Sequence, residues 1–167
     1  MRRLFAADLP EGGGDVWLDP EAANHARVLR IAVGDDVVLF DGGGRESVAR
    51  VLEISGELVR CQAGKPTLRE RASGSVTLIQ ALPKGAKIDG IVRMCTELGV
   101  AAIHLAVSER SVSRVEGERS SRKAERLERI AREAARQSER NDVPEVFAAA
   151  SLAEVAARAP ADAVRIL

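Results

Sequence analysis

The sequence predicts an α+β protein of two domains, a small β-barrel or sandwich followed by an α/β domain. Three observations lead to this fold class. Up to about residue 63, short apolar strands alternate with glycine-rich turns, which is typical of a small all-β domain. The polar segment 64–74 is interpreted as a linker. After it, strands alternate with helices, as they do in α/β domains.

The N-terminal domain is expected to contain five strands and one helix. Residues 12–14, 41–44 and 55–56 supply turns whose glycines tolerate positive φ. The helix is expected to begin after Asp19, a good N-cap, with Pro20 at its first position. The strands are expected at residues 3–7, 15–18, 36–40, 47–54 and 57–62, and the helix continues over 21–29.

The C-terminal domain is expected to begin with a buried strand, because its first residues form a nearly continuous apolar run. Apolar residues at helical spacing follow, and Gly99 is suited to end that helix in a left-handed cap. A second, arginine-rich helix carries its apolar residues on one face. The expected strands are 76–82, 101–107 and 143–148, and the expected helices are 88–98, 120–137 and 152–159.

Residues 163–167 are expected to begin another apolar strand. An α/β domain that stops inside a buried strand lacks the neighbours that such a strand needs. We therefore expect the sequence to be a C-terminally truncated part of a longer protein, with the strand from Ala163 unpaired.

Composition and charge narrow the class of protein. The chain has 167 residues, of which 46% are apolar and 30% charged, as in folded globular proteins. Its 25 basic and 25 acidic residues cancel, so no overall field favours a nucleic-acid or membrane partner. We see neither a membrane-spanning apolar run nor the apolar core of a signal peptide, and the two cysteines lack metal-ligand spacing. We expect a cytoplasmic protein without a metal.

A basic cluster is expected at the end of the N-terminal helix, where His25, Arg27 and Arg30 follow one another closely. One interpretation is structural, because cations at a helix C-terminus gain roughly 0.3–1 kcal/mol from the helix dipole. The other is RNA binding, since guanidinium groups bind phosphates and imidazole can stack on a base or hydrogen-bond to it. Arg2 and Arg3 of the first strand are candidates for the same surface.

Polar residues follow two neighbouring strands of the C-terminal domain. Lys84 comes after the first strand, and Ser108, Glu109 and Arg110 come after the second. Ligands of open α/β sheets bind outside the carboxyl ends of the strands, so we expect a ligand-binding or substrate-binding edge here. The alternative is a pair of solvated surface turns.

The end of the arginine-rich helix supplies three further candidates, Glu133, Gln137 and Arg140. A loop after this helix would bring them beside residues 108–111. The remaining charges of the helix are expected to form a solvated face of Glu–Arg pairs. His104 is expected to be a satisfied core residue, and no Ser/His/Asp or Cys/His set is visible. The identity of a catalytic residue therefore stays open.

Six motifs follow one another along the chain. They are His25-x-Arg27-Val28-Leu29-Arg30, Leu39-Phe40-Asp41-Gly42, Ala81-Leu82-Pro83-Lys84-Gly85, Thr96-Glu97-Leu98-Gly99-Val100, Ser108-Glu109-Arg110-Ser111 and Glu133-Ala134-Ala135-x-Gln137-Ser138-x-Arg140-x-x-Val143-Pro144-Glu145. In this order they resemble the RsmE family of the SPOUT superfamily, whose members methylate N3 of a uridine in small-subunit ribosomal RNA. The resemblance covers essentially the whole chain.

The resemblance implies a PUA-like RNA-binding β-barrel over residues 1–70. It implies that residues 75–167 are part of a SPOUT methyltransferase domain, a fold with a deep trefoil knot and an exception to the rule against knots. It further implies S-adenosylmethionine as methyl donor, a uridine of 16S ribosomal RNA as substrate, the small-subunit RNA or the 30S subunit as partner, and a homodimer.

The sequence departs from the family pattern in two respects. Glu139 stands where the family usually has glycine. The family's Gly-Pro-Glu-Gly-Gly and Leu-Gly-x-Arg-Ile-Leu-Arg-x-Glu-Thr segments do not occur in this sequence. Because those segments form the knot and most of the cofactor pocket, the cofactor-binding residues are expected mostly beyond Leu167, and residues 1–167 alone are expected to bind S-adenosylmethionine poorly.

Two other functions stay open at this point. If the cofactor-binding knot is missing, the chain is expected to be a non-enzymatic RNA-binding module. A purely structural dimerisation domain is the third possibility, and it predicts no RNA affinity.

Overall fold

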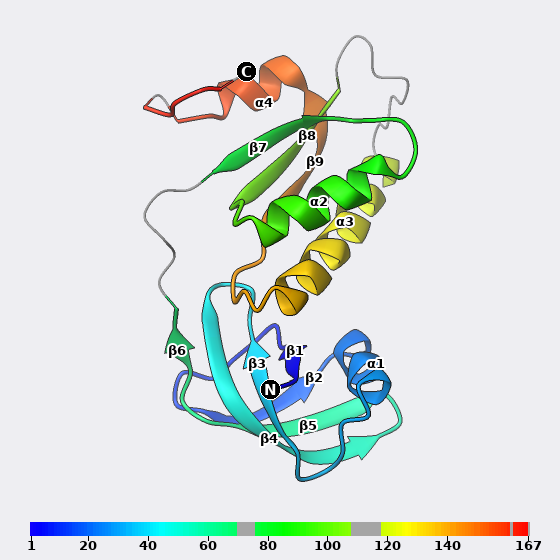
Figure 1. Ribbon diagram of the computed structural model, residues 1–167, viewed down its shortest axis with the longest axis vertical. Helices are drawn as coiled ribbons and strands as arrows, with labels where there is room; N and C mark the ends of the chain where they lie inside the picture. Colours follow the sequence, from blue (N-terminus) through cyan, green and yellow to red (C-terminus); the bar gives the residue numbers. More distant parts are fainter. Residues whose placement is uncertain (70–75, 108–117, 161, 167) are drawn as a thin grey trace. The chain divides into compact units, whose positions relative to one another are not determined.

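The computed structural model describes residues 1–69, 76–107, 118–160 and 162–166. The chain divides into two compact units (Figure 1). The first consists of Met1–Gly74 and Arg132–Val143, and the second of Ser75–Ala131 and Pro144–Leu167. The last turns of one long helix therefore belong to the N-terminal unit.

The first unit is built on a six-stranded sheet in the order β1-β3-β4-β5-β2, with β6 paired to β4. β1 runs parallel to β3, and the other paired strands of this sheet are antiparallel. A register shift between Val51 and Glu53 marks a bulge in β4, which bends the strand. The strands are β1 (Arg3–Phe5), β2 (Gly14–Leu18), β3 (Asp36–Phe40), β4 (Arg45–Ser55), β5 (Leu58–Ala63) and β6 (Thr67–Leu68).

The sheet and α1 (Pro20–Val28) enclose one apolar core. Alternate strand residues point into it, as Val16 and Leu18 of β2 and Val59 and Cys61 of β5 do. This is the period-two pattern of a sheet with one buried face. α1 adds three buried alanines, and the predicted all-β N-terminal fold with a single helix is confirmed.

Local signals at the start of α1 act as predicted. The Asp19 carboxylate accepts a hydrogen bond from the Ala22 N–H at 2.7 Å, and Pro20 is the first helical residue. The helix ends at Val28, and Arg30 has a φ of 55°. The predicted linker 64–74 is in part wrong, because Thr67–Leu68 form strand β6 on β4.

The second unit is a parallel three-stranded sheet in the order β7-β8-β9. Helices α2 and α3 lie on one side of it and α4 on the other (Figure 1). This α/β arrangement is the one predicted from the sequence, but the prediction that its first strand is buried is wrong, because no residue of β7 is buried and Ile79 is 37% exposed. The elements are β7 (Thr77–Ala81), α2 (Lys87–Glu97), β8 (Ala102–Val107), α3 (Glu118–Gln137), β9 (Glu145–Ser151) and α4 (Leu152–Ala157).

Fully buried side chains hold α2 and α3 to this sheet, among them Ile88, Val92, Ile103 and Leu127. Arg126 of α3 also makes a bidentate ion pair with Asp89 of α2, at 2.6 and 2.8 Å. In the part of the chain that the structure describes, no helix is both long enough and apolar enough to cross a membrane.

Two expectations for the second unit need correction. Residues 163–166 form no strand, and Val164 and Ile166 are almost fully exposed, because no described strand pairs with them. His104 is only half-buried, and it stacks on Phe147 with ring centroids 4.2 Å apart. Its Nδ1 atom has no partner among the described residues, so His104 is not the fully satisfied core residue that was predicted.

Candidate nucleic-acid interface

The turn between β3 and β4 is organised by Asp41. Its carboxylate accepts hydrogen bonds from the N–H groups of Gly43 and Arg45, at 2.8 and 3.0 Å, and from Nε of Arg45 at 2.6 Å. The Asp41 side chain is only 7% exposed. The predicted turn is confirmed, and the Arg45 guanidinium is held in a fixed direction at its end.

The segment that follows α3 pairs with this turn. The N–H of Gly44 donates to the carbonyl of Asn141 at 3.1 Å, and the N–H of Val143 donates to the carbonyl of Gly42 at 2.9 Å. Gly42 has a φ of 78°, and a Cβ there would lie 3.2 Å from Phe5 and 3.3 Å from Val143. The close approach therefore requires glycine.

Arg3 joins the same segment to the first strand. Its guanidinium donates to Oδ1 of Asn141 and to Glu46, the latter at 3.0 Å, and it lies over the Phe40 ring at 5.2 Å from the centroid. The Arg3 side chain is 10% exposed. These donors of Arg3 are directed into the protein, and its contact with RNA stays a prediction. We refer below to Arg3, Glu46, Asn141 and the 42–44 turn as the Asn141 latch.

His25 faces the last turns of α3. Burial and the charge of Arg136 lower the pKa of His25 below its usual value, against a raising effect of Glu133. The Nε2 atom is buried and has no partner among the described residues. His25 is thus oriented toward the protein, and the predicted basic cluster divides into an inward and an outward part.

Glu133 is the centre of the charges on this part of α3. Burial alone would raise its pKa, but hydrogen bonds from Arg136 and Gln137 lower it. Nε of Arg136 lies 2.9 Å and Nε2 of Gln137 2.7 Å from the carboxylate. Arg140, the third candidate of this region, forms an ion pair with Asp142 in the adjoining segment.

Arg27 and Arg30 form the outward part of the cluster, since both are exposed. Arg2 is also on the surface, with its side chain 47% exposed and paired to Asp35 at 3.0 Å. Arg132 was not singled out from the sequence, yet it lies over the Phe5 ring at 5.1 Å and 3.9 Å from Glu21. No local pattern signals that contact.

The substrate-binding edge predicted for the second unit is described only in part. Leu82 follows β7 and donates its N–H to Ala106 of β8 at 3.0 Å. Lys84 is exposed in the loop beyond, and Gly85 has a φ of 68°. Ser108, Glu109 and Arg110 lie outside the described residues, as does their predicted approach to Glu133, Gln137 and Arg140.

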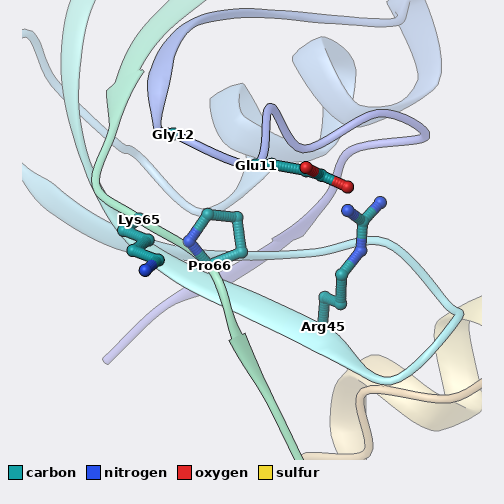
Figure 2. Close-up of a pocket in the computed structure, with 5 residues that line it drawn as sticks. All are labelled: Glu11, Gly12, Arg45, Lys65 and Pro66. Carbon is teal, nitrogen blue, oxygen red and sulfur yellow. The ribbon is translucent and has the colours of Figure 1, made fainter.

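A pocket in the first unit was not foreseen. It has a volume of about 550 Å³ and is lined by Glu11, Gly12, Arg45, Lys65 and Pro66. Figure 2 shows the Glu11 carboxylate and the Arg45 guanidinium pointing toward one another. The lining residues come from three separate stretches of the chain, so the sequence alone gives no sign of the pocket.

Both units match known family models. Residues 70–167 match the RNA methyltransferase domain, and residues 18–63 match the RNA methyltransferase PUA domain. The chain is 38% identical over 128 residues to the ribosomal RNA small subunit methyltransferase E of Synechocystis, covering 73% of this chain and 39% of that protein. The Bacillus subtilis protein of the same name is 33% identical over 129 residues, covering 76% and 50%.

Solved structures show the same fold. A ribosomal RNA small subunit methyltransferase E from Neisseria gonorrhoeae, bound to S-adenosyl methionine, has a TM-score of 0.88 at 29% identity and covers 96% of this chain and 67% of that one. A Legionella pneumophila protein in complex with the cofactor has a TM-score of 0.85 at 26% identity, covering 94% and 66%. The chain spans about half the length of the curated relatives it matches. On these grounds the chain belongs to the RsmE family of RNA methyltransferases.

Proposed function

We propose that the protein transfers a methyl group from S-adenosylmethionine to N3 of a specific uridine in 16S ribosomal RNA. The observation that carries the proposal is the family match of residues 70–167 to an RNA methyltransferase domain, preceded by a PUA unit. The names of the relatives, which act on small-subunit ribosomal RNA, support the same substrate class.

The described residues fit one side of a cofactor site. The parallel strands β7 and β8 end at one sheet edge, and such edges bind ligands in open α/β sheets. The loop 82–85 leaves that edge with free space at Gly85, where a Cβ would meet nothing within 4 Å. The exposed Lys84 stays a candidate for the substrate edge, beside which S-adenosylmethionine would supply an electrophilic methyl group when bound.

The chain's own residues would bind and orient the RNA. Arg2, Arg27 and Arg30 lie on the surface of the first unit and would contact phosphates, which position a nucleic acid without reading its sequence. His25 would act from beneath this surface, by fixing α1 against the end of α3. Ser108, Glu109, Arg110, Glu133, Gln137 and Arg140 remain our candidates for the substrate edge.

Methylation at N3 requires that the uridine lose its N3 proton and that the nitrogen lie in line with the methyl group. Positioning and electrostatic stabilisation would therefore contribute more than covalent catalysis. We further propose that the protein acts as a homodimer in the cytoplasm, where ribosomal subunits are assembled. Light scattering coupled to size-exclusion chromatography tests the dimer.

Nucleoside mass spectrometry tests the reaction. Unmodified 30S subunits are incubated with the protein and S-adenosylmethionine, and the 16S RNA is digested to nucleosides. The proposal expects N3-methyluridine only when the protein and the methyl donor are both present. RNA binding without methylation would favour the non-enzymatic RNA-binding module instead, and absence of both would favour a structural domain.

A further inference from the structure

The pocket at the start of β4 brings together the opposite charges of Glu11 and Arg45, which form no ion pair with each other in the described structure. Glu11 lies at the corner of the turn closed by the hydrogen bond from Gly13 N–H to the Pro10 carbonyl, at 2.9 Å. Arg45 is the first residue of β4. Figure 2 shows their charged groups facing one another across one side of the pocket, although Arg45 makes its ion pair with Asp41.

Asp41 fixes the direction of the Arg45 guanidinium. The Arg45 Nε is bound by the nearly buried Asp41 carboxylate at 2.6 Å, and that carboxylate is itself held by two backbone N–H groups. The guanidinium is therefore pre-organised, with its terminal nitrogen atoms toward the pocket (Figure 2). A fixed donor of this kind loses little entropy when it binds a ligand.

The charges around the pocket favour a neutral ligand over a phosphate. Asp41, Asp8 and Glu11 all act on Arg45, and the hydrogen bond that Arg45 donates to Asp41 has the largest effect in raising the Arg45 pKa. Lys65 adds one further positive charge. With three carboxylates near two cations, an anion gains little, whereas a neutral group with donors for Glu11 and acceptors for Arg45 satisfies both sides.

We propose that this pocket binds one unpaired guanine base of the RNA. Among the RNA bases only guanine places two donors, N1–H and N2–H, side by side on its Watson–Crick edge, where they match the two oxygens of a carboxylate. Its O6 and N7 acceptors match an arginine guanidinium. Pro66 offers an apolar ring, and about 550 Å³ is within the range of small-ligand pockets.

This inference rests on the proposed function, because it takes RNA as the ligand, and it adds a base-specific contact within the first unit. Sequence-specific RNA recognition commonly targets unpaired bases through their Watson–Crick edges. The pocket would thus help to select the RNA, while the exposed arginines supply affinity that does not depend on sequence.

The test compares guanine with hypoxanthine, which lacks only the N2 amino group. Fluorescence anisotropy at fixed salt measures binding of labelled uridine heptamers with a single central guanosine or inosine. We expect the heptamer with guanosine to bind about tenfold more tightly than the heptamer with inosine. Without the N2 amino group, one oxygen of the Glu11 carboxylate is left unpaired. Guanosine and inosine 5′-monophosphates, titrated by NMR on the Gly12 and Arg45 amide signals, repeat the comparison without dependence on overall RNA affinity.

Glu11→Gln provides the decisive variant, because an amide has only one acceptor oxygen, so N1–H and N2–H cannot each pair with an oxygen of their own, and the exposed site tolerates the change. This variant should reduce the preference for guanosine over inosine to less than twofold. Glu57→Gln, which removes the same charge from an exposed turn at the other end of β4, should keep it. Equal binding of the two bases to the natural protein, or a preference that survives Glu11→Gln, would overturn the inference.

The two proposals fail in different ways. A protein that forms N3-methyluridine in 30S subunits but shows no guanine preference keeps its proposed function and loses the pocket assignment. A guanine preference without methyl transfer keeps the pocket and removes the proposed reaction.

Discussion

The guanidinium of Arg3 donates a hydrogen bond to the side-chain oxygen of Asn141, a residue 138 positions later in the chain. Arg3 lies on the first strand, whereas Asn141 follows the last turn of α3. The side chain of Arg3 is 10% exposed and Asn141 is 2% exposed. The contact therefore fixes the end of α3 to the barrel by buried polar groups, which are costly to leave unpaired.

Replacement of Arg3 should destabilise the first unit. Arg3→Ala leaves Asn141 and Glu46 without their donor, which we expect to lower the free energy of unfolding by about 1–3 kcal/mol. Arg2→Ala is the matched control, because its ion pair with Asp35 is exposed and such pairs contribute about 0–1 kcal/mol. Urea unfolding followed by circular dichroism measures both. Equal losses in the two variants would refute the structural role of Arg3.

Alanine at Gly42 should destabilise the protein more than alanine at Gly56, although both glycines have positive φ. Gly42 and Gly56 have φ values of 78° and 59°, so alanine at either site costs about 1–2 kcal/mol for the left-handed conformation. At Gly42 the new Cβ would also crowd Phe5 and Val143, whereas at Gly56 it would meet nothing within 4 Å. We expect Gly42→Ala to lose clearly more stability in the same unfolding assay. A larger loss at Gly56 would mean that residues 141–143 do not pack on the turn.

The two histidines predict how stability depends on pH. The pKa values of His25 and His104 are both lowered, chiefly by burial, and the chain has no other histidine. Near and below pH 6.5 the unfolded chain therefore binds more protons than the folded one. The free energy of unfolding should be highest above about pH 7 and fall as the pH drops through 6.5.

The variant His25→Gln tests whether the histidines cause this pH dependence, because it removes one of the two titrating groups. Urea unfolding between pH 5.5 and 7.5 should show a weaker slope in this variant than in the natural protein. The lowered pKa of Glu133 acts in a more acidic range, below its ordinary value, so it leaves this window unaffected. A slope of the opposite sign would contradict the account.

Local elements were predictable because their signals are local. β3 has the predicted bounds, 36–40, and Asp19 and Pro20 mark the start of α1 as expected. By contrast, the Asn141 latch joins residues from opposite ends of the chain. The sequence predicts Glu133 beside residues 108–111, and only the fold shows that the turn of α3 that carries it belongs to the N-terminal unit.

For the candidate site, too, the sequence predicts the local features but not the contacts between distant parts of the chain. Arg27 and Arg30 are on the surface, as any exposed helix end would place them. Arg3 is directed inward by Asn141, and His25 is half-buried near Arg136 and Glu133, which no sequence pattern identifies. Glu11, Arg45 and Lys65 meet only because the 10–13 turn, β4 and the β5–β6 connection come together, a consequence of sheet topology.

The outward arginines should govern the salt dependence of RNA binding. Replacement of Arg27 and Arg30 by alanine should weaken binding and reduce the slope of log K against log salt by about one unit per lost phosphate contact. Arg50→Ala, at a site 64% exposed on β4, serves as the control. Unchanged affinity and slope in a folded double variant would leave helix-dipole stabilisation as the better explanation of these residues.

Reverse transcription across 16S RNA tests the central claim most directly, because a methyl group at N3 of uridine removes the donor needed for Watson–Crick pairing and arrests the enzyme. Unmodified 30S subunits are treated with the protein, with or without S-adenosylmethionine, and the extracted RNA is copied. The account predicts one strong stop, next to a single uridine, that depends on both the protein and the methyl donor. Full-length copies in every reaction, or stops scattered over many uridines, would contradict it.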